Sequence, residues 1–325
     1  MILHPQKTAE FSLIDTFFQA KTLTREDVLV GIGDDAALLR VPTDHLLVMS
    51  VDTLIQGIHF PTSTLPADIG YKALAVNLSD LAAMGAEPAW MTLALTLPEV
   101  DKQWLEKFSD GLFELAKQFN VQLVGGDTTR GPLTITIQVN GFVPSHALAL
   151  CRSGAKIGDK IYVSGTLGDA GLGLQVASGK HNLAEPDKQF VLQRLNKPFP
   201  RIKLGMLLRN YATSAIDISD GLLADLGHIM TASKVGAEIH ADALPLSNAI
   251  RSVLSEQEAK KLALTAGDDY ELCFTVPPEK EKQLLELLKQ ENLTCYCIGE
   301  IKKETGIQLN DFSGNVESLG YAHWL

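Results

Sequence analysis

The chain has little cysteine and little positive charge. Its four cysteines among 325 residues are too few for a disulfide scaffold. With 28 basic residues against 39 acidic ones, the formal net charge is −11. A chain this acidic is not expected to bind nucleic acid or an anionic membrane, and a small anionic substrate would need a bound metal.

Long apolar runs and a phosphate-binding signature are also missing. No stretch reaches the roughly 18 uncharged apolar residues of a membrane helix, and acids stand where a signal peptide would have its apolar core. We therefore expect a cytoplasmic protein with no membrane partner. The pattern G-x-x-x-x-G-K-[ST] does not occur, which excludes a P-loop. Around Cys295 and Cys297 the alternating sequence favours two side chains on one face of a strand over a metal or redox site.

The sequence does contain enough apolar residues, 46%, to bury a large core, and its length favours two domains. Strands alternate with helices in both halves, which predicts two domains of the α/β and α+β classes, residues 1–146 and 147–325. The expected helices are 10–20, 68–84, 104–119, 187–195, 201–211, 222–234, one between 245 and 266, and 279–290. The expected strands are 28–30, 36–40, 46–51, 91–97, 122–124, 134–142, 160–164, 214–217, 238–241, 272–276 and 294–298. The first three strands are expected to form a meander, and Asp68 to cap the helix that follows them.

The stretch GIGDDAALL at residues 31–39 places two adjacent carboxylates on a glycine turn. An ordinary hairpin turn with solvated acids is the simplest interpretation. The same residues match the dinucleotide pattern G-x-G-x-x-A, with Asp52 at the place of a ribose-binding acid. That match is rejected, because no helix fits between this turn and the strand expected at 46–51.

Further acids fall at the ends of predicted strands or helices. The set comprises Asp34, Asp35, Asp52, Asp80, Asp127, Asp217 and Asp220. Carboxylates about 4 Å apart would repel by roughly 4 kcal/mol per pair at an effective dielectric constant near 20, which divalent cations would offset. Oxygen ligands without a His or Cys cluster favour Mg²⁺ or Mn²⁺, so the residues point to metal-dependent phosphoryl transfer. Alternatives remain for single residues: Asp80 is equally compatible with solvation, and Ser219 or Asp220 with capping the helix at 222–234.

Taken together, eight stretches resemble the bacterial thiamine-monophosphate kinase family, in the same order and over nearly the whole chain. They are AEFSLI at 9–14, GIGDDAALL at 31–39, SVDTLIQGIHF at 50–60, YKALAVNLSDLAAMGAEP at 71–88, GGDTTRG at 125–131, RSGAKIGDKIYVSGTLGD at 152–169, IDISDGLLADLGH at 216–228 and GDDYELCF at 267–274. Many family members have Gly-Glu-Asp where this chain has Gly-Asp-Asp at 267–269, and threonine at the position of Val51.

The resemblance implies a fold, a reaction and an assembly. The fold is the two-domain architecture of the aminoimidazole-ribonucleotide-synthetase-like (PurM-like) superfamily, with an α/β amino-terminal domain and an α+β carboxyl-terminal domain. The reaction is transfer of the γ-phosphoryl group of ATP to the phosphate of thiamine monophosphate, giving thiamine diphosphate and ADP. The assembly is a homodimer in which amino-terminal strands pair across the interface.

The resemblance also assigns residues. The Mg²⁺ ligands would be Asp34, Ser50, Val51 through its carbonyl, Asp52, Asp80, Asp127, Asp217 and Asp220. Contacts to ATP would come from Gly126, Asp127, Arg152 and Ser219, and contacts to thiamine phosphate from His59, Asp268 and Tyr321. No catalytic side chain is assigned, because the attacking phosphate oxygen is already anionic and needs no general base. Without the family, His59 would be a packed loop residue, Tyr321 a tail aromatic and Arg152 a surface cation.

Two other functions remain open at this point. One is a different ATP-using enzyme of the same superfamily. Those that activate selenide need a reactive cysteine or selenocysteine near the amino terminus, whereas the first cysteine here is Cys151. The other is a non-catalytic protein that binds a nucleotide or a thiamine ester. The amino-terminal helix around Phe11 is expected to pack as core rather than to line the nucleotide.

Overall fold

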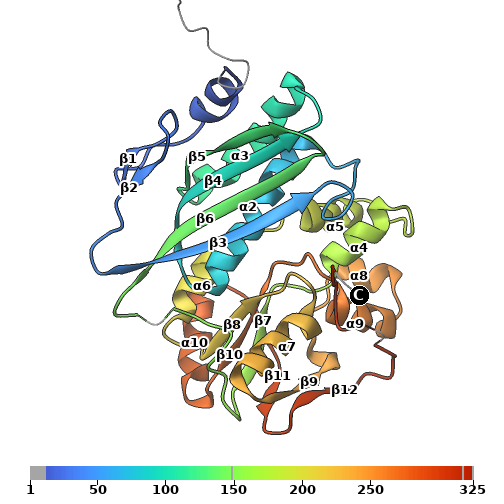
Figure 1. The fold of residues 1–325 in the computed structure, drawn as a ribbon. Helices are drawn as coiled ribbons and strands as arrows, with labels where there is room; N and C mark the ends of the chain where they lie inside the picture. The colour runs from blue at the N-terminus through green and yellow to red at the C-terminus, as the bar shows by residue number, and fades with distance from the viewer. Residues whose placement is uncertain (1–11, 148, 317, 324–325) are drawn as a thin grey trace, which may run out of the picture. The chain divides into compact units, whose positions relative to one another are not determined.

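The computed structural model describes residues 12–147, 149–316 and 318–323, and the chain divides into two compact units (Figure 1). The first unit comprises Met1–Leu78 and Pro88–Phe142, and the second Ser79–Glu87 and Val143–Leu325. The boundary expected after residue 146 stays a prediction.

A four-stranded sheet in the order β3-β6-β4-β5 forms the centre of the first unit. Its strands are β3 (His45–Ile55), β4 (Glu87–Leu97), β5 (Gln122–Arg130) and β6 (Thr134–Pro144). Helices α2 (Pro66–Ala83) and α3 (Lys102–Gln118) cover one face of the sheet (Figure 1). Strands β4 and β5 run parallel and are joined through α3, as parallel neighbours require.

Two glycines let α2 and α3 approach at backbone distance. A Cβ on Gly111 would lie 1.8 Å from the carbonyl oxygen of Ala67, and a Cβ on Gly70 2.0 Å from that of Phe108. Any side chain at either position would force the helices apart. Helix α2 begins at Pro66, so Asp68 lies in its first turn and is not the expected cap.

A short antiparallel ribbon of β1 (Val28–Val30) and β2 (Leu38–Leu39) carries the acid turn. Val28 and Leu39 pack against the core that contains Trp90 and Phe142. The π-helix η1 (Ile14–Gln19) is anchored to α3 through Lys21, which ion-pairs with Glu106 and Asp110. The expected meander is wrong, because β3 pairs within the large sheet rather than with β2. Residues 10 and 11 of the expected first helix lie outside the described residues.

The second unit is built on a six-stranded sheet in the order β12-β9-β11-β7-β10-β8. Its strands are β7 (Lys160–Ser164), β8 (Ser214–Asp217), β9 (Gly236–His240), β10 (Leu272–Val276), β11 (Cys295–Lys302) and β12 (Gly306–Asn310). The helices are α4 (Asp169–Ala177), α5 (Asp187–Asn196), α6 (Ile202–Leu208), α7 (Leu222–Ser233), the 3₁₀ turn η2 (Ala241–Ala243), α8 (Asn248–Val253), α9 (Glu256–Thr265) and α10 (Pro278–Gln290). The core packs Leu222 and Leu226 of α7 against Ile216 of β8 and Cys273 of β10.

The remaining sequence expectations for this unit are largely confirmed. The strand at 160–164 and the strand at 272–276 have the expected bounds, whereas α4 and β12 were not expected. The single helix expected between 245 and 266 is wrong, because two helices, α8 and α9, lie there. Cys295 and Cys297 lie on β11 as free thiols, so the strand interpretation is confirmed. None of the described helices is long and apolar enough to cross a membrane.

Candidate active site

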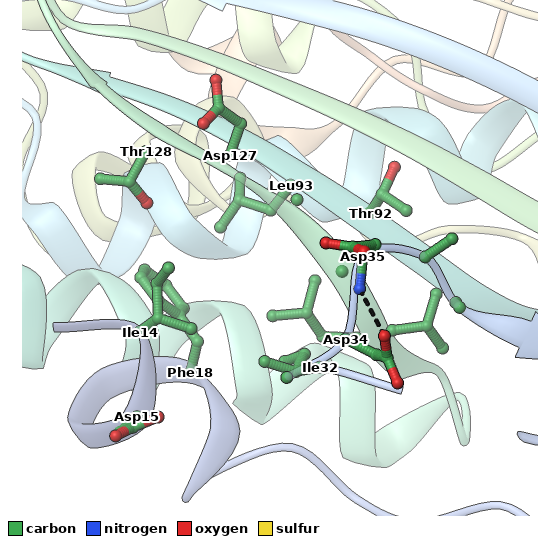
Figure 2. Close-up of a pocket in the computed structure, with 17 residues that line it drawn as sticks. Ile14, Asp15, Phe18, Ile32, Asp34, Asp35, Thr92, Leu93, Asp127 and Thr128 are labelled. Carbon is green, nitrogen blue, oxygen red and sulfur yellow. Dashed lines mark hydrogen bonds between the residues drawn. The ribbon is translucent and has the colours of Figure 1, made fainter. Parts of the chain in front are cut away.

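A pocket of about 600 Å³ lies in the first unit between η1, the acid turn, β4 and β5 (Figure 2). One part of its lining is apolar, with Ile14 and Phe18 from η1, Ile32 from the turn and Leu93 from β4. Phe17 and Phe18 of η1 are buried, as expected for a helix that packs as core, and Phe18 also lines this pocket. Phe11 lies outside the described residues.

The other part of the lining is acidic. Asp15, Asp34, Asp35 and Asp127 contribute four carboxylates, and none of the described residues that line the pocket is basic. The N–H of Asp35 donates to Oδ1 of Asp34 at 2.8 Å. In Figure 2 the carboxyl group of Asp127 points away from those of Asp34 and Asp35. Asp34, Asp35 and Asp127 are all exposed.

This donor set fits a hard divalent cation that keeps part of its shell for other ligands. Within the described ranges, no three His, Cys, Asp or Glu side chains form a ready-made metal cage. Mg²⁺ is usually held by one or two carboxylates together with water and substrate phosphates, so separated carboxylates beside an open pocket suit it. A zinc site would instead require converging His or Cys ligands.

Gly126 and Asp127 lie within β5, not on a turn after a short strand as expected. The strand continues because it pairs with β4 along its whole length, from Gln122 to Arg130. A Cβ on Gly126 would lie 1.9 Å from the carbonyl oxygen of Leu93, and its φ is 155°. The strand pairing itself therefore requires glycine here, independently of any ligand.

Ser50, Val51 and Asp52 lie inside β3, whereas a strand end was expected. The strand is longer because it pairs across the sheet instead of turning into a meander. The N–H of Asp52 donates to Oδ1 of Asn77 on α2 at 3.1 Å. Asp80 follows Asn77 by three residues on the same helix and belongs to the second unit, as do Asp217 and Asp220.

His59 lies in the loop that follows β3. Its Nδ1 accepts the N–H of Ile55 at 2.9 Å, and its carbonyl oxygen accepts Nζ of Lys72 at 3.4 Å. Lys72 is only 2% exposed. The loop is thus fixed at both the imidazole and the backbone of this residue.

In the second unit, five predicted site residues meet at the carboxyl end of β8. Asp217 ends the strand and is buried. The carbonyl of Ser219 accepts the N–H of Asp268 at 2.8 Å, and the carbonyl of Asp220 accepts the N–H of Tyr321 at 3.0 Å. Residues predicted for Mg²⁺ and ATP are therefore tied by backbone hydrogen bonds to residues predicted for the substrate.

Arg152 lies beside the same strand. It follows Cys151, whose carbonyl accepts the N–H of Ala215 in β8 at 3.0 Å. The Arg152 side chain is exposed, and its own carbonyl accepts Oγ of Ser233 at 3.2 Å.

The segment that carries Asp268 is anchored by buried charge. Glu271 is fully buried and accepts from Arg194 at 2.9 Å, from Arg201 at 2.5 Å and from the Ser164 hydroxyl at 2.6 Å. Asp269 accepts the N–H of Gly168 at 2.6 Å, and burial raises the pKa of Asp269 to about 7. This network was not predicted from the sequence, because its members are far apart along the chain.

The expectation that Ser219 or Asp220 caps α7 is wrong. The cap position is Gly221, and no side chain caps the helix there. Instead Asp225, from the first turn of α7, accepts the N–H groups of residues 219, 220 and 221. Burial raises the pKa of Asp225 to about 7, although these three N–H donors act in the opposite direction.

Comparison with known proteins identifies the family. Residues 33–143 match the model of the AIR synthase related protein N-terminal domain, and residues 156–311 that of the C-terminal domain. The thiamine-monophosphate kinase of Salmonella typhimurium is 51% identical over 296 residues, 91% of each chain. The chain belongs to the thiamine-monophosphate kinase family. The expected two-domain fold is thereby confirmed.

Solved structures of thiamine-monophosphate kinases resemble this chain in fold. The crystal structure of the thiamine-monophosphate kinase from Stenotrophomonas maltophilia is 48% identical, with a TM-score of 0.87 over 94% of this chain and 98% of that one. The structure of AaThiL complexed with AMPPCP and TMP is 32% identical, with a TM-score of 0.77 over 90% and 92% of the two chains. The kinase family predicted from the eight sequence stretches is confirmed.

Proposed function

We propose that this chain transfers the γ-phosphoryl group of ATP to the phosphate of thiamine monophosphate, which yields thiamine diphosphate and ADP. The main support is 51% identity to a thiamine-monophosphate kinase over 91% of the chain. The AaThiL complex adds support, because AMPPCP is an ATP analogue bound together with TMP in a structurally similar protein.

The reaction needs alignment and charge neutralisation more than proton transfer. The attacking atom is an anionic phosphate oxygen, so no general base is required. We propose that Gly126, Arg152 and Ser219 contact ATP. Arg152 offers a planar fork of donors that can bind phosphate through two hydrogen bonds.

Mg²⁺ is the proposed metal. When bound, it neutralises the charge that develops between nucleophile and γ-phosphate. In the first unit its proposed ligands are Asp34, Ser50, the Val51 carbonyl, Asp52 and Asp127; in the second unit they are Asp80, Asp217 and Asp220. The pocket lining supports the assignment of Asp34 and Asp127, because it holds four carboxylates and its described residues include no lysine or arginine.

The proposed substrate contacts are His59, Asp268 and Tyr321. Because Nδ1 of His59 accepts a backbone N–H, the neutral imidazole carries its proton on Nε2, where it can donate to a phosphate oxygen. The carboxylate of Asp268 would lie near the cationic thiazolium ring. Tyr321 is exposed and held beside this segment through the Asp220 carbonyl.

We further propose that the enzyme is a cytoplasmic homodimer. Strand β3 is at the edge of its sheet, and it exposes Leu46, Leu47, Met49 and Val51 to 54, 42, 57 and 58%. Exposed edge strands with apolar side chains are typical of surfaces that pair with another strand. A second copy of this chain is the proposed occupant.

A coupled assay of ADP release tests the reaction. The purified chain is incubated with Mg-ATP and either thiamine monophosphate, free thiamine or no acceptor. Turnover that requires the monophosphate is the expected result. Equal ADP release in all three reactions, or none in any, would refute the proposal.

The metal assignment is tested with Asp127→Asn. We expect kcat to fall about 10²-fold or more, since charge stabilisation is the main catalytic contribution in this chemistry. Asp44→Asn is the matched control, because Asp44 is an exposed acid of the same unit. The rate of Asp44→Asn should equal that of the unmodified chain. Removal of Mg²⁺ with a chelator should abolish turnover in the unmodified chain and in Asp44→Asn. Normal turnover of Asp127→Asn would contradict the assignment.

A further inference from the structure

Asp225 makes an unusual set of contacts with the loop that precedes α7. One oxygen of its carboxylate, Oδ2, accepts the N–H groups of Ser219, Asp220 and Gly221 at 3.0, 3.0 and 3.1 Å. The side chain is only 2% exposed. A single buried oxygen therefore fixes three consecutive peptide groups.

These contacts hold the residues that precede α7, which is not what an ordinary helix cap does. A serine or aspartate just before a helix normally uses its own side chain to accept an N–H of the first turn. Here the carboxylate comes from within the first turn and reaches back, where the helix dipole also favours a negative charge. The cap position of α7 is Gly221, so the side chains of Ser219 and Asp220 are not used as its cap.

The backbone of this loop has little room to adopt another shape. Gly221 has φ 130°, and a Cβ there would lie 2.8 Å from the carbonyl oxygen of Thr265. On the other side, the carbonyls of Ser219 and Asp220 accept the N–H groups of Asp268 and Tyr321. The N–H groups of the loop thus donate to Asp225, and its carbonyl groups accept from the segments that contain Asp268 and Tyr321.

We propose that Asp225 is a positioning residue for phosphoryl transfer: it holds the peptide groups of 219–221 so that the Ser219 and Asp220 side chains are presented to the nucleotide and its metal. This inference rests on the proposed function, which assigns ATP to Ser219 and Mg²⁺ to Asp220. Asp225 itself is not assigned a contact to ATP or to Mg²⁺.

Two substitutions of Asp225 distinguish the effect of its hydrogen-bond acceptor from the effect of its negative charge. Asp225→Ala removes the acceptor and leaves three N–H groups without it, whereas Asp225→Asn retains one oxygen that can face them. Loss of a residue that orients a metal ligand costs about 10- to 100-fold in metal affinity or activity. We expect Asp225→Ala to raise the Mg²⁺ concentration for half-maximal binding of AMPPCP by that factor, and Asp225→Asn to raise it less.

Asp159→Ala is the matched control. Asp159 is also 2% exposed in the second unit, and it also accepts a backbone N–H, that of Lys156 at 2.9 Å. Both alanine variants should unfold at lower temperature, but only Asp225→Ala should shift the Mg²⁺ requirement. If the two variants lose stability alike and both retain the normal Mg²⁺ requirement, Asp225 is merely structural and the proposal is overturned.

Hydrogen exchange on the unmodified chain tests whether the amides of 219–221 are held by hydrogen bonds. This measurement does not require that the Asp225→Ala variant folds. In the absence of metal and nucleotide, the amides of 219–221 should exchange at least tenfold more slowly than those of the exposed turn at 303–305. Equal exchange would overturn the proposal even if Asp225→Ala did not fold. Both the exchange and the AMPPCP binding are independent of turnover, so a failure of the proposed reaction would be recognised separately in the ADP assay.

Discussion

Two adjacent aspartates in the second unit differ in their burial and their backbone. Asp269 is buried and accepts N–H groups from the start of α4, whereas Asp268 is half-buried with φ 69°. Tyr270, on the other side, also has a positive φ, 49°. Such backbone is costly for residues other than glycine, and the buried anchors Asp269 and Glu271 hold it in place. The strain therefore coincides with a proposed substrate contact.

Asp268→Asn should weaken binding of thiamine monophosphate without disturbing the backbone. Asparagine tolerates a positive φ as well as aspartate does, so the change removes only the charge. A hydrogen bond or contact to a charged group is worth roughly 1.5 to 3 kcal/mol, so we expect KM for thiamine monophosphate to rise about tenfold or more, with KM for ATP unchanged.

Asp311→Asn is the control for this measurement, because Asp311 is an exposed aspartate with a similar φ, 60°, and is not one of the proposed contacts. Steady-state kinetics should give it normal values of both KM constants. If the Asp268 variant also had a normal KM for thiamine monophosphate, this residue would have no part in binding the substrate.

At the scale of elements, the strand β5 requires glycine at one of two adjacent positions but not at the other. A Cβ on Gly126 would collide with the Leu93 carbonyl, whereas one on Gly125 would meet nothing within 4 Å. Gly126→Ala should therefore lower the free energy of unfolding by about 1–3 kcal/mol or more through overpacking. Gly125→Ala should change it by less than about 1 kcal/mol. Urea denaturation of both variants measures the difference, and equal stability would contradict the observed pairing of β4 and β5.

The pairing of β7 with β11 predicts a dependence of stability on pH. Glu300 of β11 lies 2.7 Å from Nζ of Lys160 and 2.8 Å from Nζ of Lys302. Hydrogen bonds from these lysines, Lys160 first, lower the pKa of Glu300 to about 2 from its ordinary value of 4.5. The folded state therefore holds this proton less tightly than the unfolded state. The ionised Glu300 therefore stabilises the folded state. This contribution to the free energy of unfolding is complete above pH 4.5 and is lost as the pH falls towards 2.

Glu300→Gln isolates that contribution. At pH 7 the variant should be less stable, by no more than about 1 kcal/mol because the three side chains are partly solvated. Unfolding curves between pH 3 and 7 should show the deficit shrinking as the pH falls. A deficit that stays constant over this range would mean that it arises from packing and not from charge.

At the scale of the whole molecule, the exposed apolar face of β3 predicts an assembly. Met49→Glu should raise the dissociation constant of the proposed homodimer about tenfold or more, because a charge would have to be buried at the interface. Light scattering over a range of concentrations measures it. Val100→Glu is the matched control, since Val100 is 59% exposed, against 57% for Met49, and lies outside the sheet. A chain that is monomeric before any substitution would refute the assembly.

Much of the site could be predicted from the sequence because its parts are local. The stretches around Asp34, Asp127, Asp217 and Asp268 were identified together with the family, and strands such as 160–164 follow from short-range apolar patterns. Strand lengths were less predictable, because β3 and β5 continue only through pairing with neighbours. The position of Asp127 within a strand is one consequence.

The sequence by itself therefore determined the family, the two mixed α/β domains and the order of the candidate site residues, since these depend on motifs and on patterns within a few residues. Only the tertiary structure decided that Asp225 reaches back to hold residues 219–221, and that Glu271 binds Arg194 and Arg201. A carboxylate in the first turn of a helix was the available signal for Asp225, but such residues usually serve the helix dipole alone. Burial and long-range pairing assign partners that no local pattern specifies.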